Sequence, residues 1–95
     1  MIIEKTPRYN RTVKKIIKSH KLSISEIEKV ETLFIENHNN PTLHYKSIIC
    51  KKDKNRYSIR VLNTQYRILL TILDDIAYFQ ALLNHKDYDK NNKDC

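Results

Sequence analysis

Residues 57–72, YSIRVLNTQYRILLTI, decide the fold that this sequence predicts. Apolar residues alternate with polar ones on both sides of Asn63 and Thr64, a period of two that is typical of half-buried β-strands. Asn and Thr between two such runs indicate a tight turn. The stretch therefore predicts an antiparallel hairpin.

The register of this hairpin places two arginines face to face. With a two-residue loop, Arg60 lies directly opposite Arg67 on one face of the sheet, while the apolar residues of both strands share the other face. Like charges at a cross-strand pair cost up to about 1 kcal/mol, so an anion or a carboxylate between the two guanidinium groups is expected. The alternative is that both arginines are merely solvated on an exposed sheet face.

The sheet is expected to continue beyond this hairpin. Residues 76–83 form an almost continuous apolar run after a turn at residues 74–75, which predicts a third long strand. Strict alternation across a two-residue turn pairs Arg67 with Leu82. The chain must then bend beyond the strand for His85 to approach Arg67.

The part of the chain before residue 41 has helical periodicity instead. Thr6 and Pro7 are typical of a helix start, and the apolar spacing that follows predicts a helix to about residue 20. Ser23 and Glu26 form a capping box for a second helix that ends near residue 37. Two further strands are predicted at residues 2–3 and 43–50. On the second of these, His44 and Lys46 have matching parity and share the face of Arg60 and Arg67 if the register permits.

This order of elements predicts an α+β domain. An N-terminal helical hairpin is expected to pack on one face of a mostly antiparallel sheet of four or five strands. We expect a single domain over residues 1–89, because a chain of this length builds only one core. A frayed polar C-terminal tail is expected at residues 90–95.

The composition excludes several classes of protein. The 95 residues include no glycine, so the glycine-rich phosphate loops of kinases, P-loop enzymes and dinucleotide-binding proteins are absent. Cys50 and Cys95 lack metal-ligand spacing and indicate neither a zinc site nor a disulfide framework. We expect two reduced thiols in a cytoplasmic protein, with no export signal and no membrane span.

Positive charge is concentrated in two blocks. The chain carries 18 Lys and Arg against 11 Asp and Glu, a formal charge of +7. Residues 1–25 hold seven of the basic residues and one acidic residue, and residues 46–67 hold the same numbers. A polyanion is therefore the first partner to consider.

The segment after the last predicted strand carries groups that suit acid–base chemistry. Residues 84–89, NHKDYD, contain an imidazole and a phenol. Histidine exchanges protons near neutral pH, and tyrosine donates a hydrogen bond or stacks on a base.

Four segments together resemble the RelE/ParE superfamily of bacterial toxin–antitoxin toxins. They are residues 41–46 (PTLHYK), 57–61 (YSIRV), 65–69 (QYRIL) and 85–89 (HKDYD). The resemblance covers nearly the whole chain and implies that family's fold, in which a helical hairpin precedes a curved sheet. It also implies a metal-independent, ribosome-associated endoribonuclease that cleaves mRNA, inhibits translation and needs no cofactor.

The resemblance implies a role for each candidate residue. Arg67 matches the family's arginine at the scissile phosphate, and Arg60 matches a second phosphate ligand. His85 and Tyr88 match the C-terminal motif that supplies an acid or base and a stacking residue. The expected catalytic residues are Arg67, His85, Tyr88 and Lys46, and the expected RNA- or phosphate-binding residues are Arg60, His44, Lys51 and Lys52.

The resemblance also implies partners and leaves an alternative function open. We expect a cognate antitoxin, acidic in its toxin-binding segment, besides mRNA and the ribosomal A site, and no membrane. ParE-type members inhibit DNA gyrase without a nuclease site, so a gyrase inhibitor or a simple nucleic-acid-binding module is the alternative. Convergence of His85 with Arg60 and Arg67 in one cleft separates the nuclease from the inhibitor.

Overall fold

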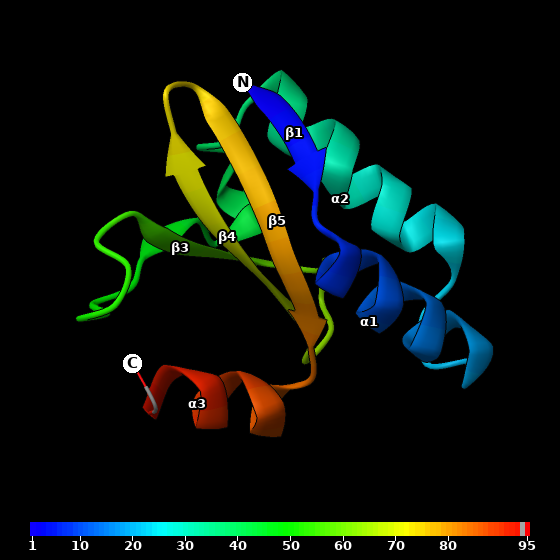
Figure 1. The fold of residues 1–95 in the computed structure, drawn as a ribbon. Coiled ribbons are helices and arrows are strands. Elements are labelled where there is room, and N and C mark those ends of the chain that lie inside the picture. The colour runs from blue at the N-terminus through cyan, green and yellow to red at the C-terminus, as the bar shows by residue number, and fades with distance from the viewer. Residues whose placement is uncertain (94) are drawn as a thin grey trace.

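The computed structural model describes residues 1–93 and 95, over which a five-stranded sheet is packed between α-helices (Figure 1). The strands are β1 (Ile2–Lys5), β2 (Lys46–Ser47), β3 (Arg56–Arg60), β4 (Arg67–Leu73) and β5 (Ile76–Leu83). The helices are α1 (Pro7–Lys18), α2 (Ile24–Glu36) and α3 (His85–Lys93), with a short 3₁₀ helix η1 (Pro41–Leu43). None of the described helices has the length and apolar character needed to cross a membrane.

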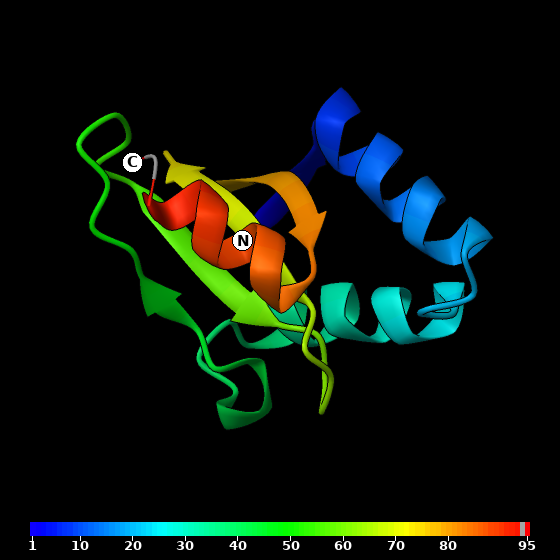
Figure 2. The ribbon, with the colours of Figure 1, turned by 90° about the horizontal axis from the view of Figure 1, so that it is seen from below.

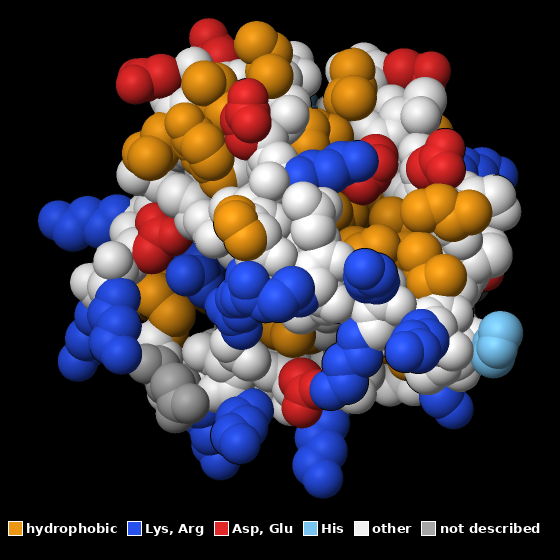
Figure 3. Space-filling model, turned by 45° about the vertical axis from the view of Figure 1, so that its right-hand side comes forward, with side chains coloured by type: hydrophobic (Ala, Val, Ile, Leu, Met, Phe, Trp, Pro, Cys, Tyr) orange, Lys and Arg blue, Asp and Glu red, His pale blue; other side chains and the backbone are white. Residues whose placement is uncertain are grey.

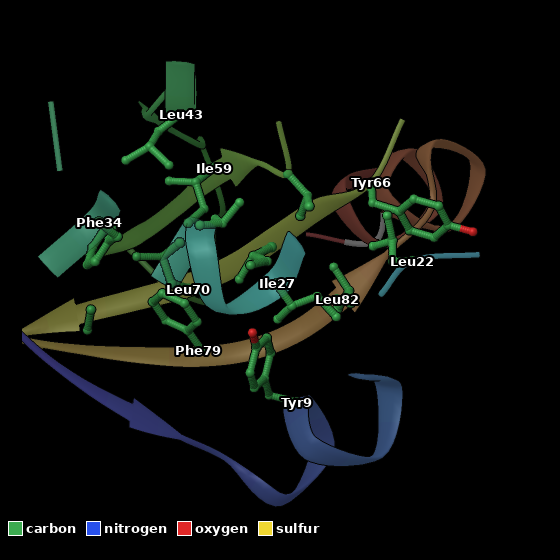
Figure 4. Close-up of a cluster of buried hydrophobic side chains, with 14 residues drawn as sticks. Tyr9, Leu22, Ile27, Phe34, Leu43, Ile59, Tyr66, Leu70, Phe79 and Leu82 are labelled. Carbon is green, nitrogen blue, oxygen red and sulfur yellow. The ribbon is translucent and has the colours of Figure 1, made fainter. Parts of the chain in front are cut away.

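The sheet has the order β1-β5-β4-β3-β2. Strand β1 runs parallel to β5, and every other neighbouring pair is antiparallel. The α+β class and the mostly antiparallel sheet are therefore confirmed, with β1 and β2 as the two edges. Strand β5 curves along its length, as the close-up of the core makes plain (Figure 4).

Both predicted N-terminal helices begin where their capping residues indicate. The Thr6 side chain accepts a hydrogen bond from the Tyr9 N–H, with proline in the first helical turn. Ser23 and Glu26 form the predicted reciprocal capping box at the start of α2. These contacts satisfy backbone N–H groups that a helix start leaves without partners.

Helices α1 and α2 cover one face of the sheet and bury its main core (Figure 4). The rings of Tyr9 and Phe34 both pack edge-on against Phe79 of β5, at centroid distances of 5.4 Å. Aromatic pairs in this geometry contribute about 0.5–1.5 kcal/mol beyond their buried area. The helix pair is thus fixed to the middle of the sheet, which leaves the opposite face for other contacts.

The β3–β4 hairpin has the predicted register but a longer loop. Arg60 pairs with Arg67, as predicted. The Val61 N–H donates to the Tyr66 carbonyl at 3.0 Å, and residues 62–65 form the loop with Leu62 in the left-handed region. Opening the last predicted pair lengthens the loop by one residue on each side, so the register is unchanged.

The predicted pairing of Arg67 with Leu82 is wrong by one residue. Asp74 and Asp75 both have positive φ, as a tight two-residue hairpin turn requires. Further along, Leu70 pairs with Phe79 but Leu69 pairs with Ala81, so a β-bulge skips residue 80. The bulge places Leu83 opposite Arg67, so these two side chains lie on the same face of the sheet.

Residues 85–93 form a helix, so the predicted frayed tail is helical as far as residue 93, and residue 94 lies outside the described residues. The Asn84 side chain accepts a hydrogen bond from the Asp87 N–H at 2.8 Å, which starts α3. Residues 90–93 complete this helix, so the predicted boundary after residue 89 falls inside it.

The two cysteines are paired, which contradicts the expectation of two reduced thiols. Cys50 and Cys95 form a disulfide with a Cα–Cα distance of 4.7 Å. They lie 45 residues apart in the sequence and meet only because α3 returns its end to the loop before β3. The strand predicted at residues 43–50 is also mostly wrong, because only Lys46 and Ser47 form strand β2.

Candidate active site

The sheet face opposite α1 and α2 gathers basic side chains. Residues directly opposite each other on neighbouring strands share a face. Lys46 pairs with Ser58, Arg60 with Arg67, and Arg56 with Thr71. Because residues 56, 58 and 60 alternate along β3, all these side chains emerge on one side. We call Lys46, Arg56, Arg60 and Arg67 the basic face.

Arg60 and Arg67 lie opposite each other without a counter-charge in the part of the chain that the structure describes. Both are half-buried, and among the described residues no carboxylate forms an ion pair with either guanidinium. The Arg60 Nε donates to the Thr64 carbonyl at 3.0 Å, which fixes that side chain against the hairpin loop. The Arg67 Nη1 is buried and has no hydrogen-bond partner among the described residues. Two guanidinium groups with unused donors are suited to bind a phosphate.

Tyr88 lies over Arg67. Its ring centroid is 5.7 Å from the Arg67 Cζ, within the range of a cation–π contact. Its hydroxyl is 2.9 Å from the Ser58 Oγ on β3. Tyr88 is 5% exposed and Ser58 1%, so both polar oxygens depend on this one contact. Helix α3 thereby covers part of the basic face (Figure 2).

His85 is the first residue of α3 and remains accessible. Its Nε2 is 3.2 Å from the Asp89 Oδ2 one helical turn further on, and the imidazole is 59% exposed. Because the bulge makes Leu83 the partner of Arg67, His85 follows only two residues after that pair. The structure therefore places His85 at the Arg67 end of the sheet, while the imidazole itself contacts the Asp89 carboxylate.

Of the remaining predicted residues, Lys46 lies in a strand, whereas His44, Lys51 and Lys52 lie outside the strands. Lys46 lies exposed on β2 and shares the face of Arg60 and Arg67, as predicted. His44 follows η1 in the left-handed region and is not part of a strand, so the predicted matching parity with Lys46 is wrong. Lys51 and Lys52 are exposed in the turn after Cys50.

Three contributors to this face were not predicted. Arg56 and Ser58 precede Arg60 at steps of two residues, so the alternation of β3 alone would have found them. Asp53 comes from the preceding loop and forms an ion pair with Arg56 at 3.2 Å. Arg56 therefore has a carboxylate partner, whereas Arg60 and Arg67 have none among the described residues.

Asp53 also ties its loop to the sheet. Its carboxylate accepts hydrogen bonds from the Thr71 hydroxyl, the Asn55 N–H and the Arg56 guanidinium. Burial works to raise the pKa of Asp53, but these hydrogen bonds and the Arg56 charge outweigh it and lower the pKa below its usual value.

A lowered pKa makes this stabilisation depend on pH in a definite direction. It is fully present above the unfolded-state pKa of about 3.9 and is lost as pH falls through the lower folded-state value. We expect Asp53→Asn to cost about 1 kcal/mol at neutral pH and almost nothing near pH 2. Urea unfolding of both proteins at the two pH values measures this. An equal difference at both would contradict the assigned ionisation.

Further basic side chains lie on the exposed face of α1. Arg11, Lys14, Lys15 and Lys18 line a shallow hollow there. Figure 3 shows Lys and Arg side chains gathered over much of one side of the molecule. Within the part of the chain that the structure describes, no group of three or more His, Cys, Asp or Glu side chains is placed to hold a metal ion.

Comparison with known proteins identifies the fold. Neither the protein-family models nor the curated proteins give a match. Among solved structures, the chain is similar to YafQ from E. coli strain BL21(DE3), with a TM-score of 0.74, 16% identity, and coverage of 90% of this chain and 94% of that one. YafQ in the E. coli DinJ-YafQ toxin-antitoxin complex gives a TM-score of 0.73 and 18% identity, covering 90% and 92%.

A third similar structure comes from another organism. The YoeB dimer from Staphylococcus aureus gives a TM-score of 0.69 and 15% identity, covering 90% of this chain and 97% of that one. All three alignments run over nearly the whole of both chains. The chain therefore has the fold of YafQ and YoeB, the RelE-like fold that its sequence resemblance implied.

Proposed function

We propose that this protein is the toxin of a type II toxin–antitoxin pair and cleaves mRNA on the ribosome as an endoribonuclease. The observation that carries the proposal is the opposed Arg60–Arg67 pair, which has no carboxylate partner among the described residues. The shared fold with YafQ supports it, because YafQ is found in a toxin–antitoxin complex. Ribosomes and mRNA place this activity in the cytoplasm.

The reaction is a transesterification within the RNA. A ribose 2′-oxygen attacks the adjacent phosphorus while a base removes the hydroxyl proton. The bond from phosphorus to the next 5′-oxygen breaks as an acid protonates that oxygen. Cations stabilise the charge of the phosphorane between these events. The products are a 2′,3′-cyclic phosphate and a 5′-hydroxyl.

Each role falls to a side chain at one end of the sheet. Arg67 and Arg60 bind the scissile phosphate and stabilise its developing charge. His85 is the exposed acid or base, and its Nε2 contact with Asp89 leaves Nδ1 for the substrate. Tyr88 stacks on a base once the ring is released from Arg67.

The other basic residues extend the RNA path away from the scissile phosphate. Lys46 is exposed beside this site and assists with charge stabilisation. His44, Lys51 and Lys52 are also exposed, and we assign them to the RNA backbone on either side.

One observation favours the alternative of a gyrase inhibitor without nuclease activity. In this conformation Tyr88 covers Arg67 and the His85 imidazole contacts Asp89, so the catalytic groups do not form one open cleft. A nuclease requires α3 to move, whereas an inhibitor that binds a protein target does not.

The test of the proposed function is expression in bacteria followed by assays of both targets. We expect growth arrest, arrested translation and cleaved mRNA, with rescue when the cognate antitoxin is co-expressed. Purified protein, assayed in the presence of a thiol reductant, should cleave mRNA bound to ribosomes and leave gyrase-catalysed supercoiling unchanged. Inhibited supercoiling with intact mRNA would favour the alternative.

The antitoxin is expected to bind through acidic residues. Two segments of the chain each carry seven basic residues against one acidic residue, and complementary charge accelerates association at low salt. We expect the association rate to fall at least about tenfold between 0.01 M and 0.1 M salt, as the Debye length shrinks from about 30 Å to about 10 Å. Stopped-flow measurements test this, and a rate independent of salt would contradict it.

A further inference from the structure

The non-covalent contacts between helix α3 and the sheet are few. Its sequence, HKDYDKNNK, is almost entirely polar, and Tyr88 is its buried residue. One further hydrogen bond joins its Asn91 Oδ1 to the Arg8 Nη2 of α1 at 2.9 Å. Isolated helices shorter than about 12 residues are marginal in water, so these contacts alone hold α3 loosely.

The position of α3 in which Tyr88 covers Arg67, which we call closed, also carries a free-energy cost. It leaves the Arg67 Nη1 buried without a hydrogen-bond partner among the described residues. A buried donor that lacks a partner has lost its hydrogen bonds to water without replacement, and the free-energy cost is greater when the group is charged. The closed helix covers the arginine that the proposed function assigns to the phosphate. Opening α3 relieves this cost and exposes Arg67 in the same movement.

The Cys50–Cys95 disulfide opposes that opening. Cys95 lies just beyond the end of α3, and Cys50 lies in the loop that leads to β3. With β5 attached at the other end, α3 is held covalently on both sides. The cross-link restricts how far the end of α3 can move from the sheet, so detaching α3 costs more free energy in the oxidised protein than in the reduced protein. The oxidised protein therefore keeps Arg67 covered.

We propose that Cys50 and Cys95 form a thiol–disulfide site that controls access to Arg67, an inference that rests on the proposed function for its biological meaning. The oxidised protein is closed and holds Tyr88 on Arg67. The reduced protein releases the end of α3 and admits the RNA phosphate.

A dithiol reductant of low molecular mass supplies the electrons. One of its thiolates attacks the Sγ of Cys95, the more exposed of the two cysteines; the disulfide bond breaks, and the Cys50 thiolate leaves and takes a proton. The second thiolate of the reductant then attacks the reductant sulfur that is bonded to Cys95. The Cys95 thiolate leaves and takes a proton. Two electrons pass to the protein, and the reductant becomes a cyclic disulfide. A disulfide compound reverses the sequence.

The test measures the accessibility of Arg67 without RNA. Phenylglyoxal modifies exposed guanidinium groups, and mass spectrometry of peptides gives the rate at each arginine. We expect the rate at Arg67 to rise at least about tenfold when the full-length protein is reduced, while the rate at exposed Arg11 of α1 stays unchanged. An unchanged rate at Arg67 would overturn the proposal.

Two variants separate the disulfide from other effects of the reductant. Cys95→Ser and Cys50→Ser should both show the fast Arg67 rate under oxidising as well as reducing conditions. Thiol titration of the oxidised wild-type protein should find no free thiol. A Cys95→Ser protein whose Arg67 rate still responds to the reductant, or free thiols in the oxidised wild type, would count against the switch.

RNA cleavage then distinguishes the switch from the proposed function. Cleavage by the reduced protein, with at least about a tenfold loss on oxidation, supports the switch. If the Arg67 rate responds but neither form cleaves RNA, the switch stands and the nuclease assignment fails. If both forms cleave equally and the Arg67 rate does not respond, the switch is refuted and the nuclease assignment stands.

Discussion

Arg67→Ala is expected to reduce mRNA cleavage by about 100-fold or more and to abolish toxicity. The substitution removes the guanidinium that binds the scissile phosphate, and loss of one such stabilising group typically costs about 10²–10³ in rate. The fold should be retained, because the Arg67 Nη1 has no hydrogen-bond partner among the described residues that the change would break. Cleavage of ribosome-bound mRNA by the purified variant measures the effect.

Two controls give this result its meaning. Arg67→Lys keeps the charge but loses the planar fork of donors, so its activity should be intermediate. Thermal unfolding followed by circular dichroism should show that both variants remain folded. A folded Arg67→Ala protein with wild-type toxicity would remove Arg67 from the site.

His85→Ala is expected to lower cleavage by about 10²–10⁴-fold, the usual contribution of a general acid or base. One limb of the pH profile of the cleavage rate should disappear with the imidazole. Asp89→Asn is the matched control, because it alters the contact of the imidazole and keeps the imidazole itself. Its effect should be much smaller than that of His85→Ala.

Tyr88→Ala is the companion variant, because Tyr88 belongs to the same C-terminal segment. It should also lower cleavage substantially, through loss of base stacking, which contributes about 1–3 kcal/mol per base. Losses below about threefold in both His85→Ala and Tyr88→Ala would favour the gyrase inhibitor over the nuclease.

The N-terminal half of the fold was predictable because its signals are local. The caps at Thr6 and Ser23 are made by residues within one helical turn, so the sequence displays them directly. The β3–β4 register was equally accessible, since a period of two specifies which face each residue takes. Arg60 and Arg67 were placed opposite each other by that rule alone.

The bulge in β5 left no comparable signal. Residues 81–83 are all apolar and are buried on either side of the sheet, so a shift by one residue changes nothing in the pattern. Ala81 and Leu83 pack toward Tyr88, while Leu82 packs in the main core. Only the tertiary structure reveals the shift, and it decides how the chain approaches Arg67.

Helix α3 and the disulfide were missed for a related reason. A helix with one buried residue has no hydrophobic stripe, so its polar sequence is typical of a loose tail. Only the Asn84 cap marked its start. Cys50 and Cys95 become neighbours through the path of the whole chain, which no spacing rule describes.

The candidate site was predicted in part. Alternation supplied Arg60, Arg67 and Lys46 on one face, and the C-terminal motif supplied His85 and Tyr88. Contact between Tyr88 and Ser58 depends on how α3 folds back across β3. That contact joins the C-terminal segment to the strand that carries Arg60, and no sequence pattern predicts it.

The chemistry of the cut RNA ends shows whether this protein cleaves mRNA by transesterification. Reduced protein is incubated with ribosomes that carry a defined mRNA, and the 3′ end of the upstream fragment is identified by mass spectrometry. The wild-type protein should leave a 2′,3′-cyclic phosphate, and Arg67→Ala should leave the mRNA intact. Intact mRNA with the folded, reduced wild-type protein, or fragments that end in a 3′-hydroxyl, would contradict the account.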